Sequence, residues 1–309
     1  MNSRKMSDLA KAKRGKLIFY WACLAYPLLQ FIIFWIGVNA KSLLFCFQEY
    51  DIDTLRYVFN GFENFEKVFY NFANDGTYLQ MLYRSITALI APLVIGVPFG
   101  LLFSYYISKK MKMSGFFNVM LYLPQMVSAV VLTLLFRYFA DRFLPEALRS
   151  IMPQNFVGFI SDDRYQFATL IFYSLLTSFG TTTILYASAM SAVPQSMSEA
   201  AQLDGCNEFK EFIYITFPSI YSTFSVFVVT TLATLFTQQL HEYTFFTNGS
   251  ALFSYNQTLG YALYRDTVLN NTPQGYPLLA TYGILYSIVT IVLTFSARWV
   301  LGRIGPSVD

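Results

Sequence analysis

The sequence predicts an all-α integral membrane protein with six transmembrane helices, on the evidence of its composition and of the length of its apolar segments. Apolar residues make up 55% of the 309 residues, and charged residues make up only 13%. Six apolar segments approach or exceed the ~20 residues that a helix needs to cross the hydrocarbon core of a bilayer. We expect helices there, because lipid offers no hydrogen-bond partner to the backbone of an open strand.

These segments divide the chain into one transmembrane domain and two short tails. A basic tail at residues 1–16 precedes the domain at residues 17–302, and a second tail covers residues 303–309. A polar loop at residues 191–218 separates the fourth span from the fifth. The expected bounds of the spans are residues 17–38, 86–107, 116–139, 167–187, 219–240 and 278–300.

The first apolar segment has features of a cleaved signal peptide as well as of a span. Basic residues precede it, and Val38-Asn39-Ala40 looks like a cleavage site. However, the apolar segment from Leu17 to Val38 is longer than the ~7–15 residues of a signal-peptide core. We therefore expect an uncleaved first span.

The distribution of Lys and Arg predicts the orientation in the membrane. Basic residues crowd the amino-terminal tail, and Lys109, Lys110 and Lys112 follow the second span. The segments expected on the other side carry their basic residues thinly, mixed with Asp and Glu. Dense Lys and Arg in short segments mark the cytoplasmic side. We expect both termini and the loop at 191–218 on the cytoplasmic side of a plasma membrane.

The loop between the fourth and fifth spans has a defined local pattern. Residues 199–201 read Glu-Ala-Ala, which favours a helix. Gly205 stands where that helix would end, because glycine readily takes the left-handed backbone of a helix C-terminus. Pro218 lies at the entry to the next span, where its missing N–H costs little. The pattern predicts a short helix, a glycine break and a second helical segment.

This pattern resembles the "EAA" loop in membrane permease subunits of bacterial ABC importers, although Phe217 stands where that family usually has leucine. The resemblance implies a short coupling helix that docks into a cleft on a cytoplasmic ATPase subunit. The residues expected to couple this chain to the ATPase are Glu199, Ala200, Ala201, Asp204, Gly205, Ile215 and Pro218.

The resemblance extends beyond the loop. The segments at residues 47–51, 61–65 and 303–306 look like the first-subunit type of sugar permease. This implies the type I permease fold of ABC importers. It also implies four kinds of partner: a second homologous permease, two ATPase subunits that bind ATP and magnesium, an extracellular sugar-binding protein and the sugar itself. Such permeases work by alternating access.

The sequence contains none of the motifs by which the chain could hydrolyse ATP alone. It has no G-x-x-x-x-G-K loop, and no nucleophile-elbow or zinc-protease motif. Cys23, Cys46 and Cys206 are scattered, and His241 is the single histidine, so neither a disulfide framework nor a metal site is expected. We expect no catalytic residue, no metal and no cofactor in this chain, and we expect that it is not an enzyme.

Two spans carry neutral polar residues at helical spacing, one before and one after the loop. Polar residues inside membrane helices usually face the bundle interior or a watery path. Neutral hydrogen-bonding groups suit a sugar, whereas Ser and Thr also serve simply to pack membrane helices together. The stripe on the fifth span continues toward His241 or Glu242.

The resemblance assigns a role to these stripes. In permeases similar to the larger maltose-transporter subunit, substrate contacts lie on the helices that flank the coupling loop. We locate the matching positions in this chain by counting residues from Glu199 and from Pro218. Gln239 is the alternative to Gln238 if the register shifts by one. The expected substrate path is Ser174, Ser178, Thr181, Thr231, Thr234 and Gln238.

The sequence therefore predicts a permease subunit of an ATP-driven importer that moves a sugar, most simply an oligosaccharide, across a bacterial plasma membrane. Two alternatives stay open. The same architecture could import another solute, such as a glycerol-phosphate or an amino-acid derivative, but a phosphate would call for Arg or Lys in the cavity. A membrane enzyme or sensor would need clustered catalytic groups or a signalling domain, and the sequence offers neither.

Overall fold

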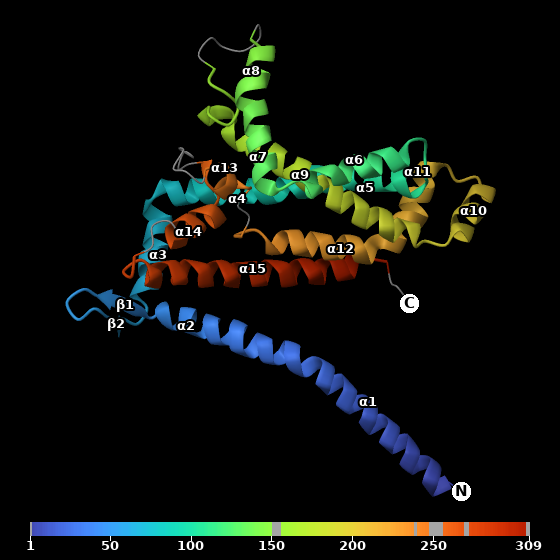
Figure 1. Ribbon diagram of the computed structural model, residues 1–309, viewed down its shortest axis with the longest axis horizontal. Helices are drawn as coiled ribbons and strands as arrows, with labels where there is room; N and C mark the ends of the chain where they lie inside the picture. The colour runs from blue at the N-terminus through green and yellow to red at the C-terminus, as the bar shows by residue number, and fades with distance from the viewer. Residues whose placement is uncertain (1, 150–155, 238–239, 247–255, 269–271, 307–309) are drawn as a thin grey trace. The chain divides into compact units, whose positions relative to one another are not determined.

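The computed structural model describes residues 2–149, 156–237, 240–246, 256–268 and 272–306, with side chains described outside residues 2–12 and 38. The chain forms two compact units, one of residues 1–69 and 271–284 and the other of residues 70–270 and 285–309. Each unit is built mainly of helices (Figure 1).

The first unit begins with one long helical run. This run comprises α1 (Asn2–Gln30), the π-helical turn η1 (Phe31–Ile36) and α2 (Gly37–Phe45). A two-stranded antiparallel hairpin follows, β1 (Gln48–Asp51) and β2 (Arg56–Phe59), with Gln48 opposite Phe59. These strands were not expected from the sequence. Asn64 in α3 (Glu63–Asn74) fixes the hairpin to α2, because its buried amide donates to the carbonyls of Cys46 (3.0 Å) and Gln48 (2.8 Å).

The second unit holds most of the remaining helices. Their bounds in chain order are α4 (Gly76–Ala91), η2 (Pro92–Gly96), α5 (Val97–Ser108), α6 (Ser114–Met126), α7 (Ala129–Tyr138), η3 (Phe139–Phe143), α8 (Leu144–Ala147), α9 (Asp163–Ser191), α10 (Gln195–Leu203), α11 (Glu208–Glu211), η4 (Phe212–Thr216), α12 (Phe217–Ala233), α13 (Glu242–Phe245) and α14 (Leu259–Val268). The last helix, α15 (Tyr276–Ile304), has residues in both units.

Five helical runs within the described residues are long and apolar enough to cross a membrane. They are Lys13–Phe45, Gly76–Ser108, Asp163–Ser191, Glu208–Ala233 and Tyr276–Ile304. A sixth is obtained if the bent pair formed by α6 and the run α7–α8 counts as one span. The prediction of an all-α membrane protein with six spans is confirmed on that basis.

The prediction of one continuous span at 116–139 is wrong. The helix breaks after Met126, and the segments on either side are bent by 101°. The break arises because Val127 and Ser128 both adopt extended backbone, with ψ of 142° and 131°. The 13 residues of α6 rise only ~20 Å, less than the ~30 Å hydrocarbon core, so α6 alone is too short to cross it.

The bounds of the fifth span also differ from those expected at 219–240. The helical run begins at Glu208 and passes through Pro218 without a break, because η4 precedes that proline and places it in the first turn of α12. It ends at Ala233 instead of Leu240. Beyond it, Leu240 and His241 have left-handed backbone, with φ of 44° and 60°, which no continuing helix allows.

Helix α9 lies at the centre of the second unit, in contact with α4, α5, α6 and α12 (Figure 1). Ser104 on α5 has its hydroxyl 2.7 Å from the carbonyl of Thr183 on α9. Apolar residues on either side of this contact, including Leu101, Tyr186 and Ile220, form a buried cluster. On another face of α9, Gly180 faces the backbone of Leu121 on α6.

We predict that Gly180→Ala destabilises the protein. A Cβ atom there would lie 2.0 Å from the carbonyl oxygen of Leu121, so α6 and α9 would have to separate. Overpacking of this kind costs ~1–3 kcal/mol. The thermal melting temperature in detergent should therefore fall. Gly115→Ala on α6 is the matched control, because its Cβ would meet nothing within 4 Å; equal melting temperatures for both variants would contradict the contact.

Candidate functional site

A cavity of about 210 Å³ lies between α4, η2, α9 and α12 in the second unit. Its polar lining consists of hydroxyl groups, and no lining residue is charged. Phe179 and Phe227 supply aromatic surface. The hydroxyl-bearing residues that line it are Ser174, Ser178, Thr182, Thr230, Thr231 and Thr234.

The hydroxyl protons in this cavity are directed to the helix backbone. Ser178 donates to the carbonyl of Ser174 at 2.8 Å, and Thr231 donates to that of Phe227 at 2.9 Å. Thr234 donates to the carbonyl of Thr231 at 2.7 Å. A hydroxyl oxygen that has given its proton to the backbone keeps lone pairs for other donors. The cavity therefore offers neutral acceptors to a ligand that carries donors.

The structure brings together four of the six residues that the sequence analysis assigned to a substrate path, namely Ser174, Ser178, Thr231 and Thr234. Thr181 is not among the lining residues; its hydroxyl accepts a hydrogen bond from Gln125 on α6. Thr182, which the sequence analysis left out, lines the cavity instead. Spacing alone gave no way to separate i+3 from i+4 after Ser178. Gln238 and the alternative Gln239 lie outside the described residues.

The predicted continuation of the polar stripe toward His241 and Glu242 does not follow the helix. Glu242 is completely buried, and its carboxylate accepts from the backbone N–H (3.2 Å) and the hydroxyl (2.9 Å) of Thr258. Burial raises the pKa of Glu242 well above its usual range, although the bonds from Thr258 act in the opposite direction. The backbone N–H of Leu259, the residue after Thr258, donates to the hydroxyl of Ser85 on α4 at 2.9 Å. Glu242 therefore fastens α13 to the start of α14, and α14 is in turn bonded to α4.

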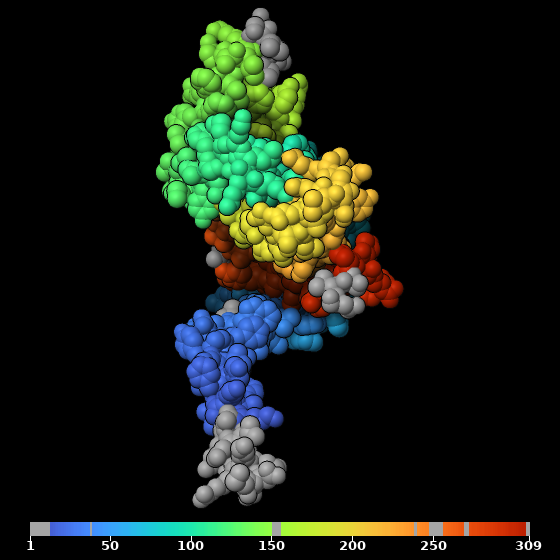
Figure 2. Space-filling view, turned by 90° about the vertical axis from the view of Figure 1, so that its right-hand side faces the viewer, coloured from blue at the N-terminus to red at the C-terminus, as the bar shows by residue number. Residues whose placement is uncertain are grey.

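The predicted coupling loop has the expected local structure. Helix α10 covers the Glu-Ala-Ala residues and ends at Leu203, and Gly205 follows with φ of +80°. The backbone N–H of Cys206 donates to the carbonyl of Ala201 at 2.9 Å, and Asn207 caps α11 by accepting from Lys210 at 2.9 Å. The loop forms the surface at one end of the unit (yellow in Figure 2).

A buried polar group ties this loop to the end of α5. Glu211 on α11 is only 2% exposed, and its carboxylate accepts from Lys109 and, at 2.6 Å, from Ser198 on α10. Lys109 also donates to Ser198 at 3.2 Å. Tyr105 on α5 adds a bond of 3.2 Å to the carbonyl of Glu208. These contacts bond α10 and α11 to the end of α5, a connection that spacing in the sequence did not reveal.

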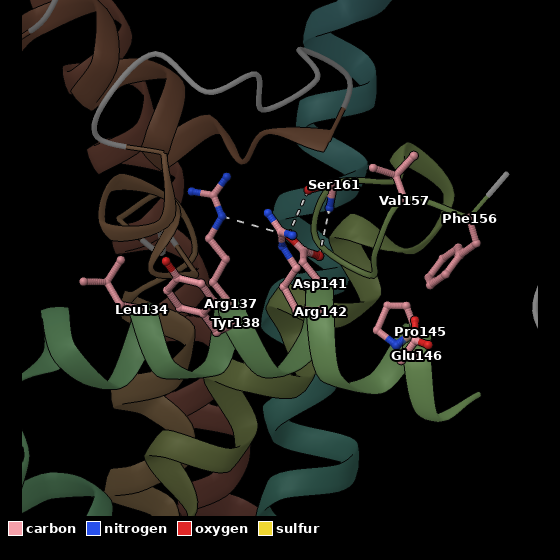
Figure 3. Close-up of a pocket in the computed structure, with 10 residues that line it drawn as sticks. All are labelled: Leu134, Arg137, Tyr138, Asp141, Arg142, Pro145, Glu146, Phe156, Val157 and Ser161. Atoms are coloured by element: carbon pink, nitrogen blue, oxygen red, sulfur yellow. Dashed lines mark hydrogen bonds and ion pairs between the residues drawn. The ribbon is translucent and has the colours of Figure 1, made fainter. Parts of the chain in front are cut away.

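A second cavity, of about 670 Å³, lies along α7, η3 and α8 (Figure 3). Its lining includes Arg137, Asp141, Arg142 and Glu146, so opposite charges balance. The carboxylate of Asp141 accepts from the backbone N–H of Ile160 (2.8 Å) and from the hydroxyl of Ser161 (2.8 Å). Asp141 thus holds the 156–161 segment against the helix, which is a structural role.

The charged and polar groups of the described residues do not form a metal centre. No group of three or more His, Cys, Asp or Glu side chains among them could hold a metal ion. The three cysteines are free.

Comparison with known proteins identifies relatives of this chain. The family model "Binding-protein-dependent transport system inner membrane component" matches residues 93–309. The chain is 28% identical over 218 residues, 68% of its length, to 73% of the probable ABC transporter permease protein YurN of Bacillus subtilis (strain 168). It is 22% identical over 309 residues, 98% of its length, to 93% of the arabinooligosaccharides transport system permease protein AraP of Halalkalibacterium halodurans.

A solved structure extends the comparison to the fold. Over 98% of this chain, the fold matches the whole of a chain in the crystal structure of a bacterial ABC transporter that imports the acidic polysaccharide alginate, with a TM-score of 0.78 and 20% identity. The predicted permease fold is confirmed. The family match contains the predicted coupling loop and the part of the cavity lining that follows residue 92, whereas Ala88, Leu89 and Pro92 precede it. The chain therefore belongs to the family of binding-protein-dependent transport system inner membrane components.

Proposed function

We propose that this chain is a permease subunit of an ATP-driven importer for a neutral sugar, most simply an oligosaccharide. The observation that carries the proposal is the cavity, which is lined by six hydroxyl-bearing residues and no charge. Sugar hydroxyls are donors that match the free lone pairs of Ser178, Thr231 and Thr234, and the aromatic faces of Phe179 and Phe227 suit the apolar face of a sugar ring. A relative named for arabinooligosaccharide transport supports the same class of substrate.

The size of the cavity supports a second permease. Sites that enclose a small molecule usually measure ~300–1,000 Å³, whereas this cavity measures about 210 Å³. We propose that a homologous second permease supplies the opposite wall, that two cytoplasmic ATPase subunits bind ATP and magnesium, and that an extracellular binding protein delivers the sugar. The hydroxyls of this chain hold the sugar, and the contacts of α5 with α10 and α11 transmit the motion of the ATPase.

A charged solute fits the cavity less well. A glycerol-phosphate would leave its phosphate without a cation, because no lining residue is basic. Burying an unpaired charge is costly.

Gln238 stays a proposed member of the substrate path, and Thr181 is proposed to act on the path only through Gln125.

The exposed surface of the loop supports its proposed contact with the ATPase. Leu203 is 89% exposed and Phe209 is 67% exposed, and both lie beside the Gly205 break. Exposed apolar side chains on this loop are available for contact with a partner protein. We propose that α10, with Glu199, Ala200, Ala201, Asp204 and Gly205, docks in the ATPase cleft.

The proposed orientation, with both termini and the coupling loop in the cytoplasm, is testable at a native cysteine. Cys206 lies in the loop and is partly exposed, whereas Cys46 is buried. We expect a membrane-impermeant maleimide to label Cys206 in inside-out vesicles but not in intact cells. A Cys206→Ser variant is the control for label that reaches Cys23. Labelling of Cys206 in intact cells would overturn the orientation.

Coupling is tested by two substitutions at one position. Gly205 has φ of +80°, so a β-branched residue there is strained, although a Cβ atom at this position would meet nothing within 4 Å. We expect Gly205→Val to leave the complex assembled but to reduce uptake by tenfold or more. Gly205→Asn is the matched control, because Asn tolerates left-handed backbone, and it should retain most uptake. Full uptake and full substrate-stimulated ATP hydrolysis in Gly205→Val would contradict a coupling role.

The sugar cavity is tested by removing hydroxyls without changing side-chain shape. Thr231→Val and Thr234→Val each delete one acceptor from the cavity. A neutral hydrogen bond contributes ~0.5–1.5 kcal/mol, so uptake per assembled complex should fall by about two- to tenfold. The measurement is uptake of the sugar carried by the partner binding protein, normalised to purified complex.

Thr294→Val on α15 is the matched control for this test. The Thr294 hydroxyl also donates to its own helix, at 2.8 Å from the carbonyl of Thr290, but it does not line the cavity. If Thr231 and Thr234 serve only helix packing, their variants should melt earlier and transport normally per folded complex. That pattern would refute the cavity assignment and leave membership of the family untouched.

A further inference from the structure

We infer that the groove between α12 and the carboxyl-terminal end of α15 binds the headgroup of an anionic phospholipid. The groove is a cavity of about 520 Å³ within the second unit, and it shares only Thr230 with the lining of the proposed sugar cavity. The two helices lie side by side in Figure 1, and the hydroxyl of Tyr221 on α12 joins them by donating to the carbonyl of Leu301 at 2.9 Å.

The positive charge of the groove favours binding of an anion. Arg298 is the only charged residue that lines it. The guanidinium has no ion-pair partner in the part of the chain that the structure describes. An unpaired Arg on a membrane helix is costly unless an acceptor reaches it. A phosphodiester oxygen is such an acceptor, and guanidinium binds it with geometric specificity.

The hydroxyl groups of the groove add donors for the same anion. The Ser225 hydroxyl is buried and has no hydrogen-bond partner among the described residues, and Ser222 lines the groove one turn away. A buried hydroxyl without a partner is unusual. A phosphate oxygen between α12 and α15 would satisfy Ser225 and Arg298 together.

The depth of the site fits a lipid headgroup. The 29 residues of α15 rise ~43 Å, which matches the ~40–45 Å of a bilayer with its headgroups. Arg298 precedes the last helical residue by six positions, or ~9 Å, close to the boundary of the hydrocarbon core. Trp299 beside it is 59% exposed and stacks with Arg303 at 4.0 Å. An exposed Trp with a basic residue is typical of the membrane interface.

The remaining lining suits the acyl part of the lipid. Val226, Val229 and Leu301 give the groove an apolar wall, and Gly302 and Gly305 leave it open. Gly305 is also the position where a Cβ would meet the ring of Tyr221 at 2.2 Å, so the floor of the groove depends on glycine there. Basic pockets between membrane helices are known to take anionic headgroups, and this groove has that combination of features.

The test compares two lipids and two arginines in the assembled, purified transporter. Phosphatidylglycerol and phosphatidylcholine of the same acyl chains are titrated in detergent, with bound lipid counted by native mass spectrometry and the melting temperature recorded. We expect phosphatidylglycerol to stabilise the wild type more than phosphatidylcholine does. Arg298→Gln should lower its occupancy at limiting lipid by about tenfold, since one charge-assisted hydrogen bond is lost.

Arg303→Gln is the matched control, because it removes the same charge from the same helix outside the groove. It should keep the preference for phosphatidylglycerol, and Ser225→Ala should weaken that preference without lowering the stability in phosphatidylcholine. Equal effects of both lipids, or equal losses in Arg298→Gln and Arg303→Gln, would overturn the proposal. So would the same stabilisation by inorganic phosphate alone, which would indicate a free-anion site, or loss of the second permease from Arg298→Gln in both lipids, which would indicate a protein occupant.

Discussion

The close contact of α9 with α5 is the constraint on which both the cavity and the proposed coupling loop depend. Ser104 bonds the carbonyl of Thr183 at 2.7 Å, so the two backbones are held near one another in the middle of the second unit. The adjacent Thr182 lines the cavity, and beyond the end of α9 the chain enters α10. A shift of α9 along α5 would therefore displace both the part of the cavity wall that α9 forms and the proposed coupling loop that follows α9.

The contacts of Glu211 link α10 to the end of α5. A carboxylate that is only 2% exposed must keep its partners, because an unpaired buried charge is costly. Its partners are Lys109 on α5 and Ser198 on α10, so α10 and the end of α5 cannot separate without breaking that group. A force applied to α10 would thereby reach α5 and, through the contact of α5 with α9, a helix that lines the cavity.

Much of this architecture was predictable from the sequence, and the errors have physical causes. Apolar length identified the spans because lipid leaves the backbone no choice except a helix. The left-handed turn at Gly205 was predictable because few other residues tolerate that backbone. The 101° bend after Met126 was not predictable. Val127 is apolar and Ser128 is small, and residues of both kinds are common inside continuous membrane helices. Tertiary contacts, such as that of Gly180 with Leu121, decide such positions.

The cavity residues were likewise predictable only in part, because tertiary contacts decide some of them. Ser174 and Ser178 were found by spacing because one face of a helix repeats at four residues, but that rule cannot separate Thr181 from Thr182. The separation comes from α6, whose Gln125 bonds Thr181 and leaves Thr182 to face the cavity. Glu242 was attached to the polar stripe on the assumption that the helix continues, whereas the left-handed backbone at Leu240 and His241 removes it.

The hydroxyl lining has a consequence for a transporter as opposed to a receptor. A hydrogen bond to a charged group contributes ~1.5–3 kcal/mol, whereas a neutral hydrogen bond contributes only ~0.5–1.5 kcal/mol. Because each hydroxyl of Ser178, Thr231 and Thr234 is already bonded to its own helix, the empty cavity leaves no hydroxyl proton of these three unsatisfied. A ligand held only by such neutral bonds could therefore leave the cavity without a large penalty, which is consistent with the proposed role of the cavity in sugar transport.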